Sequence, residues 1–198
     1  MRILSVRRGF EADHSSSSYE FFALDKLTPE QRAAVQELTG ESGHRHLRFH
    51  YMGDWSDIPD EWPDKLLAMG YDILVSESYD WWSVQLSLPH DATLARRLQQ
   101  YACESDGNGF SLKVVGERMI LYFGMQLDYG AVYDAFGEDP FEGFADLFET
   151  VREELLAGDL SAVWAMVETY GRYADNEAEP AEPLSASAGT LLNVMENY

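Results

Sequence analysis

The stretch that most constrains the fold of this chain is Tyr71–Pro89, with the sequence YDILVSESYDWWSVQLSLP. It contains two apolar runs, Ile73–Val75 and Trp81–Leu88, separated by five mostly polar residues. The second run alternates between two sets of side chains, which are Trp82, Val84, Leu86 and Leu88 on one side and Trp81, Ser83, Gln85 and Ser87 on the other. A period of two predicts a strand with one face in the core and the other facing solvent or a partner. We therefore expect a β-hairpin at the centre of a mixed sheet, with the Trp82 set in the core.

Other segments of the chain carry equally local signals. Strand patterns cover residues 19–24, 46–52, 110–115 and 118–123, and helix patterns cover residues 29–38, 63–70, 91–101, 141–158 and 159–170. Thr28 followed by Pro29 predicts a capped helix start, and Gly40 predicts its end. The helix that begins at Asp91 is expected to continue to Cys103, before a loop that begins at Ser105. This order favours an α+β fold with a mainly antiparallel mixed sheet, helices on one face and a C-terminal helical pair; a decorated ferredoxin-like arrangement is one option.

The domain organisation follows from where the pattern changes. We expect a sheet domain over residues 1–124 and an acidic helical extension packed on it over residues 125–173. We expect residues 174–198 to form an acidic linker with two prolines, over residues 174–187, followed by an apolar C-terminal segment over residues 190–198.

Charge is distributed unevenly along the 198 residues, whose formal net charge is −21. Residues 1–118 carry 19 acidic and 12 basic side chains, whereas residues 119–198 carry 16 acidic side chains and only Arg152 and Arg172 as bases. Such an excess of acid repels nucleic acids and anionic membranes, which bind through Lys and Arg. The expected partner is a basic protein surface or a larger protein assembly, and we predict no direct contact with nucleic acid or membrane.

The remaining composition narrows the compartment and the chemistry. A single cysteine, Cys103, excludes an internal disulfide. The N-terminus lacks the apolar run of a signal peptide, and no run approaches the ~18 apolar residues of a membrane span. We expect a cytoplasmic protein. No P-loop, dinucleotide fingerprint or EF-hand loop is present, so no cofactor is predicted.

Three segments carry a family resemblance: RRGFEADHSSSSYEFFALD at the start, SESYDWW in the middle and VREELLAGDL in the acidic half. With these segments, in this order, the chain resembles a group of bacterial proteins to which no activity is assigned. The resemblance covers about the first four fifths of the chain. It implies a bacterial cytoplasmic α+β protein and transfers no residue role.

One cluster has the residue types of a metal site. His44, His46 and His50 lie close in sequence, with Asp54 behind them. On a strand, residues i and i+2 stand ~6.6 Å apart, so two imidazoles can chelate a metal ion whereas a third at i+6 hardly can. Arg48 adds a repelling charge. The alternative is an exposed polar face of the sheet.

Exposed aromatic side chains and the C-terminus are the candidate binding features. Tyr79, Trp81, Trp55 and Trp62 are predicted in loops or on an outer face, where aromatic residues anchor protein interfaces. The alternative is that they form a satellite core. Leu191, Met195 and Tyr198 have the spacing of a docking peptide, and the alternative is that this segment folds back on its own domain.

Two functions remain as hypotheses. The first is a non-enzymatic interaction module, an adaptor or small subunit of a bacterial assembly, whose acidic helices bind a basic partner through residues such as Glu149, Glu153 and Glu154. A DNA-mimic inhibitor is a special case of it. The alternative is a metal-dependent hydrolase that uses the His44, His46 and His50 region.

Overall fold

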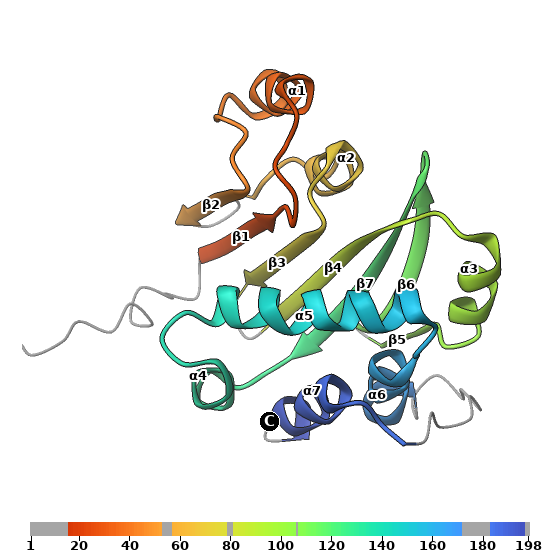
Figure 1. The fold of residues 1–198 in the computed structure, drawn as a ribbon. Helices are drawn as coiled ribbons and strands as arrows, with labels where there is room; N and C mark the ends of the chain where they lie inside the picture. The colour runs from red at the N-terminus through yellow and green to blue at the C-terminus, as the bar shows by residue number, and fades with distance from the viewer. Residues whose placement is uncertain (1–15, 53–56, 79–80, 106, 172–182, 197–198) are drawn as a thin grey trace, which may run out of the picture.

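The computed structural model describes residues 16–52, 57–78, 81–105, 107–171 and 183–196. The strands are β1 (Ser16–Phe22), β2 (His46–Met52), β3 (Ile73–Ser78), β4 (Trp81–Pro89), β5 (Cys103–Ser105), β6 (Asn108–Val115) and β7 (Arg118–Gln126). The helices are α1 (Pro29–Thr39), α2 (Trp62–Met69), α3 (Ala92–Gln99), α4 (Tyr129–Phe136), α5 (Pro140–Ala157), α6 (Ser161–Tyr170) and α7 (Ala186–Glu196). Figure 1 shows their arrangement.

The strands form one sheet of seven in the order β2-β1-β3-β4-β7-β6-β5, and every pairing is antiparallel. The α+β class and the helices that end the chain are confirmed. The predicted hairpin is present as β3 and β4, close to the centre of the sheet. A split βαβ unit has two parallel strands with a third strand between them. The segment β2-α2-β3 is such a unit, because β1 lies between β2 and β3 and pairs antiparallel with both.

Capping residues and turn glycines near each element predict several of the observed boundaries. Thr28 caps α1 in a capping box with Gln31, and Gly40 ends the helix in the left-handed conformation. Strand β2 begins and ends at the predicted residues. The two-residue turn between β6 and β7 contains Gly116 with φ 60°, a conformation that glycine adopts without steric cost.

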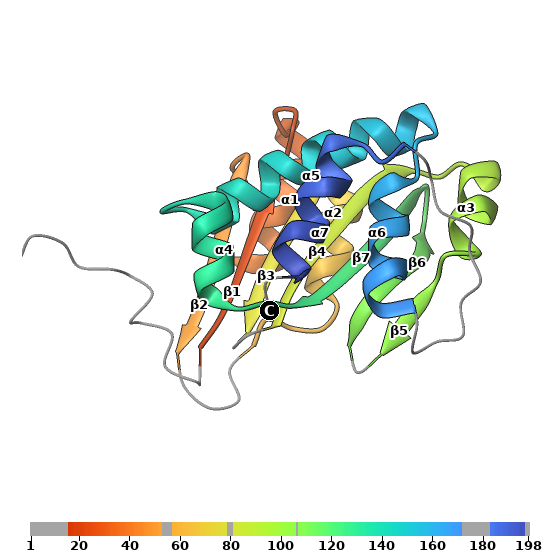
Figure 2. The ribbon, with the colours of Figure 1, turned by 90° about the horizontal axis from the view of Figure 1, so that it is seen from below.

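Helices cover both faces of the sheet, and the expectation that they lie on one face is wrong. Helices α5 and α6 pack on one face with α7 against them, while α2 contacts β3, β4 and β7 and also packs against α1. Figure 2, turned by 90°, shows α5, α6 and α7 together on one side of the strands and α1 with α2 on the other. The larger core lies on the α5 side and includes Val84, Leu121, Phe148 and Val163. The smaller core lies under α1 and α2.

This double cover changes the environment of β4. The Trp82 set is buried as predicted, with Trp82 2% exposed and Val84, Leu86 and Leu88 fully buried. Ser87, on the opposite face, is also fully buried, because α2 covers it and the Leu67 carbonyl accepts a hydrogen bond from its hydroxyl at 3.1 Å.

Two further expectations need correction. Helix α3 ends at Gln99, and Cys103 begins strand β5 instead of continuing the helix. The C-terminal segment is a helix, α7, that packs on α6 and α5. It starts at Ala186, before the predicted apolar segment.

Candidate interaction site on helix α5

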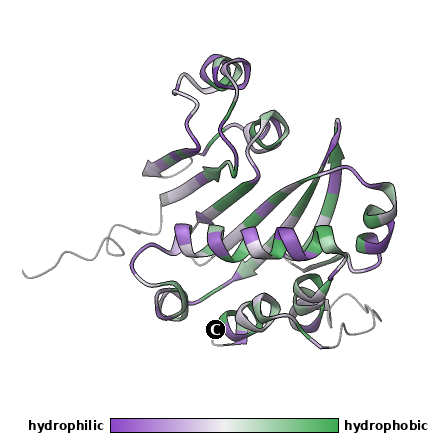
Figure 3. Ribbon diagram, in the orientation of Figure 1, coloured by the Kyte–Doolittle hydropathy of each residue, from purple (hydrophilic) through white to green (hydrophobic). Residues whose placement is uncertain are grey.

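Helix α5 owes its limits to capping residues. The Asp139 side chain accepts a hydrogen bond from the Glu142 backbone N–H at 3.2 Å, Pro140 occupies the first turn, and Gly158 closes the helix with φ 90°. One side of α5 is buried against the sheet through Phe144, Phe148, Val151 and Leu155, among others. The helix is therefore amphipathic and its outer side is free to carry charge. Figure 3 shows hydrophilic and hydrophobic bands alternating along α5.

Four carboxylates line the outer side of α5. Glu142, Asp146, Glu149 and Glu153 recur at intervals of four, three and four residues, and all are exposed. This spacing places them on one side of the helix. None of them forms an ion pair with another residue of the described part of the chain. We call these four residues the α5 carboxylate row.

The only base on α5 does not neutralise the row, because it points inward. Arg152 lies 3.5 Å from the Asp72 carboxylate, and Arg118 of β7 lies 3.2 Å from the same oxygen. The second Asp72 oxygen accepts the Leu24 backbone N–H at 3.0 Å. Ser87 adds its hydroxyl and carbonyl as acceptors for Arg118, at 2.8 and 3.1 Å. This cluster joins α5 to Asp72, just before β3, and to β4 and β7, so Arg152 adds no positive charge to the outer side of the helix.

A cavity of about 320 Å³ lies beside the row. Its apolar lining comes from Phe22, Ala23, Leu24, Ile73 and Ala145; its polar lining comes from Glu142, Asp146, Glu149, Arg45 and His46. Three members of the row therefore form one wall of a partly apolar hollow between α5 and the strands β1 and β2.

The two bases that line the cavity, Arg45 and His46, are already engaged. The Arg45 guanidinium donates to the carbonyls of Ala23, at 3.1 Å, and Leu24. The His46 ring lies 2.6 Å from the buried Glu20 carboxylate and stacks on Phe22 at 4.5 Å between ring centres. Because protein acceptors already hold both groups, the charge available in the cavity is that of the carboxylates.

The predicted metal cluster is dispersed. His46 binds Glu20, which also accepts from Arg48 at 2.6 Å, whereas the His50 ring lies 2.7 Å from the Ser18 hydroxyl. His44 accepts the Tyr71 hydroxyl through its backbone carbonyl at 2.7 Å. Among the residues that the structure describes, no three His, Cys, Asp or Glu side chains are grouped to hold a metal ion. Asp54 lies outside the described residues.

The predicted aromatic anchors differ in how far they are exposed. Trp81 is exposed, at 39%. Trp62 packs on Phe49 at 5.3 Å and belongs to the edge of the smaller core, as the satellite-core alternative expects. Trp55 and Tyr79 lie outside the described residues.

The C-terminal segment folds back on its own domain, as the alternative to a docking peptide expects. Leu191 is fully buried and Met195 is 5% exposed, because α7 lays its apolar side on the larger core. The helix is held there by Glu154, whose carboxylate accepts from Ser185, at 3.0 Å, and from Ser187. Glu154 is therefore a structural residue, and the available α5 carboxylates are Glu149 and Glu153 with Glu142 and Asp146. Tyr198 lies outside the described residues.

Sequence reasoning missed Glu142 and Asp146 as members of the site. The signal that finds them is the helical period: once Phe144, Phe148 and Val151 are assigned inward, the acidic residues four and three positions apart fall on the opposite side. The inward turn of Arg152 has no local signal, because its partner Asp72 lies 80 residues earlier.

Cys103 offers no reactive site. It is 3% exposed, and burial raises the pKa of its thiol, which keeps the thiol protonated and weakly nucleophilic.

Comparisons with known proteins assign no family to this chain. No protein-family model, no curated protein and no solved structure matches this chain. None of the helices in the described ranges is long and apolar enough to cross a membrane.

Proposed function

We propose that the protein is a non-enzymatic interaction module that binds a cationic segment of a partner protein along the α5 carboxylate row. The observation that carries the proposal is an exposed row of four carboxylates without ion pairs, on a helix whose only arginine is turned inward. A Lys- or Arg-rich segment supplies the missing positive charges. The proposal keeps the protein in the bacterial cytoplasm, as an adaptor or small subunit of an assembly.

The cavity beside the row supports a protein partner. Lys and Arg side chains bury their aliphatic stems on apolar surface while the charged group stays near carboxylates or water. Phe22, Leu24 and Ile73 offer such a surface in the cavity that Glu142 and Asp146 also line. A long basic side chain of the partner can therefore lie in the cavity and place its charge at the rim.

The spacing of the row favours a basic peptide over the DNA-mimic special case. From Glu142 to Glu153 the helix rises about 17 Å, which gives one charge per about 5.5 Å. One strand of DNA carries a phosphate per about 3.4 Å of axis, and the duplex carries twice that density. A single row is therefore too dilute to imitate a duplex, while it is sufficient for a short cationic segment.

The test compares two variants of equal net charge. The row variant carries Glu142→Gln, Asp146→Asn, Glu149→Gln and Glu153→Gln; the control variant carries Asp25→Asn, Glu37→Gln, Glu41→Gln and Glu117→Gln, which are exposed acids outside α5. Binding of a nona-arginine peptide is measured by calorimetry over a range of salt concentrations. We expect the row variant to bind at least about tenfold more weakly, with a shallower salt dependence, and the control variant to stay within about threefold of the native protein.

Equal loss in both variants would mean that the net charge alone attracts the peptide, and the proposal would be wrong. Binding that does not change with salt would also contradict it, because exposed charge pairs are screened by salt.

A further inference from the structure

Strand β2 lies at one edge of the sheet and pairs on one side only (Figure 1). Each of its residues from His46 to Met52 pairs in unbroken register with β1. The strand at the other edge, β5, has three residues and contacts α6. Proteins commonly protect a sheet edge with lysine, proline, a bulge or a very short strand. Strand β2 has none of these features, and β1 is its only paired strand in the described part of the chain.

The outer edge of β2 exposes the backbone of three residues. Just before β2, the Ala23 N–H donates to the Arg45 carbonyl at 2.7 Å. In an antiparallel ladder, such pairs alternate with pairs whose N–H and C=O groups point away from each other. His46, Arg48 and His50 stand at these alternate positions, so their N–H and C=O groups point out of the sheet. No hydrogen bond joins these groups to another backbone group within the described ranges. We call these three the edge residues.

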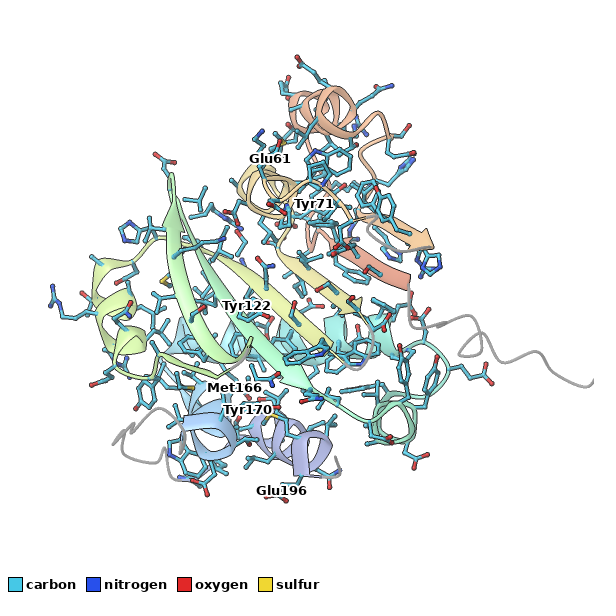
Figure 4. All side chains as sticks on the ribbon, turned by 180° about the vertical axis from the view of Figure 1, so that it is seen from behind. Glu61, Tyr71, Tyr122, Met166, Tyr170 and Glu196 are labelled. Atoms are coloured by element: carbon cyan, nitrogen blue, oxygen red, sulfur yellow. The ribbon has the colours of Figure 1, made fainter. Side chains whose placement is uncertain are left out.

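The two sides of β2 differ in chemistry. On one side, Leu47 and Phe49 are buried in the smaller core, and Tyr51 beside them is half-buried. Trp62, which packs on Phe49, is also half-buried. Figure 4 views the sheet from the side of this core, in which Tyr71 is labelled. On the other side of β2 are the side chains of the edge residues, and all three are exposed. A strand beside β2 therefore meets aromatic rings on one side and basic groups on the other.

The basic side of β2 contrasts with the rest of the chain. Residues 43–52 contain two arginines, three histidines and no Asp or Glu, in a chain with a net charge of −21. The Arg48 side chain is 44% exposed, whereas the Glu20 carboxylate that it contacts at 2.6 Å is buried. The surface on this side therefore presents arginine and histidine. Because oppositely charged side chains on neighbouring strands attract each other, acidic side chains suit this side of a partner strand.

A second copy of the chain fits this edge poorly. Antiparallel pairing of two copies over all three edge residues places Arg48 opposite the same arginine of the second copy. Like charges directly opposite each other destabilise a strand pair. Each copy also has a net charge of −21, so the two chains repel each other over longer distances. The charge on β2 therefore favours a different protein as the partner.

We propose that the free edge of β2 binds an extended segment of a partner protein, in which acidic and apolar residues alternate, as an added antiparallel strand. The residue opposite each edge residue exchanges both backbone hydrogen bonds with it and lies on the same side of the sheet. The acidic residues therefore carry the hydrogen bonds to β2. The apolar residues between them extend the smaller core over Tyr51 and Trp62.

This site differs from the α5 carboxylate row in place and in the charge of its ligand. Helix α5 packs on β3 and β4. The added strand lies three strand spacings from β3, which is about 14 Å. That distance exceeds the Debye length of about 8 Å at physiological ionic strength, so the row repels the acidic segment only weakly.

The experiment uses the full chain and a capped, dye-labelled peptide of four Val-Glu repeats, with binding followed by fluorescence anisotropy at physiological ionic strength. Two N-methylated forms of this peptide are the matched controls. Methylation of the glutamate nitrogens removes the N–H groups that face β2 and should weaken binding at least about tenfold. Methylation of the valine nitrogens alters groups that point away from β2, so binding should stay within about threefold. A neutral Val-Gln peptide should bind about fivefold more weakly.

Two variants of the protein test the same site. His50→Pro removes one outward N–H at a type of position where edge strands accept proline, so it should fold, as circular dichroism measures, and bind Val-Glu at least about tenfold more weakly. Arg48→Gln should weaken Val-Glu binding and leave Val-Gln binding unchanged. The row variant should bind Val-Glu as the native protein does, which separates this site from the proposed function.

Several results would overturn the proposal. They are equal effects of the two methylations, Val-Gln binding as tight as that of Val-Glu, no binding of any peptide, and self-association of the protein through β2 in sedimentation. The methylated peptides decide the matter even if His50→Pro does not fold, because they are measured with the native protein.

Discussion

The two faces of the sheet are built from the same strands and differ in what covers them. On one face, α5, α6 and α7 complete a continuous apolar core, and even the last helix is buried in it. On the other, α1 and α2 cover the smaller core, and Trp81 of β4 is exposed on the same side of the sheet. The first face presents charge to the solvent through the outer side of α5, whereas the second presents the exposed Trp81 beside half-buried Gln85 and Gln126. The chain therefore has two chemically distinct surfaces.

The difference shows that alternation along a strand does not by itself decide which side chains are buried, because burial also depends on the helices that pack on each face. In β4, both sets of side chains are buried near Ser87, where α2 lies above the strand. At the other end of β4, Trp82 is buried under α4 and α5, with ring contacts to Tyr129, Phe141 and Phe144 at 6.1, 5.3 and 5.3 Å, while its neighbour Trp81 is exposed.

The largest expected effect is on the face that carries α5. Trp82→Ala removes a side chain that is 2% exposed and touches three rings, so it should lower the free energy of unfolding by about 3–5 kcal/mol. Urea denaturation measures this. A loss below about 1 kcal/mol would show that the aromatic cluster over β4 does not stabilise the fold.

A second substitution tests the cluster that fixes α5 on the sheet. Asp72→Ala leaves Arg118 and Arg152 without their shared carboxylate, and we expect a loss of about 3 kcal/mol in unfolding free energy. Glu61→Ala is the matched control, because its pair with Lys65 is exposed and such pairs contribute under about 0.5 kcal/mol. Equal effects in the two variants would contradict the structural role of Asp72.

The smaller core makes a prediction about pH. Burial raises the pKa of Tyr71 from its ordinary value of 10 to about 12. Above pH 10 the unfolded chain loses this proton while the folded chain keeps it, so stability is constant below pH 10 and falls as the pH rises to 12. At about 1.4 kcal/mol per pKa unit, the loss due to Tyr71 is roughly 3 kcal/mol.

Urea denaturation of the native protein and of Tyr71→Phe at pH 9 and pH 12 isolates this contribution from those of other tyrosines. The native protein should lose more stability than the variant between the two pH values. A parallel decline in both would show that Tyr71 ionises freely in the folded state.

The smallest expected effect is at Trp81, on the side of the sheet opposite α5. Trp81→Ala should cost under about 1 kcal/mol in unfolding free energy, because the side chain is 39% exposed. The contrast with Trp82→Ala, one residue away, is the sharpest comparison of the two faces. A loss at Trp81 as large as that at Trp82 would make Trp81 part of the core.

Much of the fold is predictable because its signals are local. The caps of α1, α3 and α5 depend on Thr28, Asp91 and Asp139 next to their helices, and the turn at Gly116 depends on two residues. The hairpin of β3 and β4 follows from an alternation within nine residues. Local patterns of this kind decide where an element begins and ends.

The rest depends on contacts between distant segments. The burial of Ser87 requires α2 above it, and the burial of Leu191 and Met195 requires α6 beside them. The candidate site on α5 is partly predictable, since the acidic sequence points to Glu149, Glu153 and Glu154 as partner-binding residues, and the first two are exposed. Glu154 instead binds Ser185 and Ser187. The carboxylates of the row have no neutralising base on their own helix, because Arg152 forms an ion pair with Asp72 instead. No local stretch of sequence shows this ion pair.

The central claim is that the chain recognises a cationic segment through α5 and not through its overall charge. The most direct measurement is a nuclear magnetic resonance titration of the ¹⁵N-labelled protein with nona-arginine. The proposal predicts that the largest shifts fall on the backbone amides of residues 142–153 and their neighbours around the cavity, with small shifts at the exposed acids of α1. Shifts spread evenly over all acidic segments, or absent from α5, would contradict it.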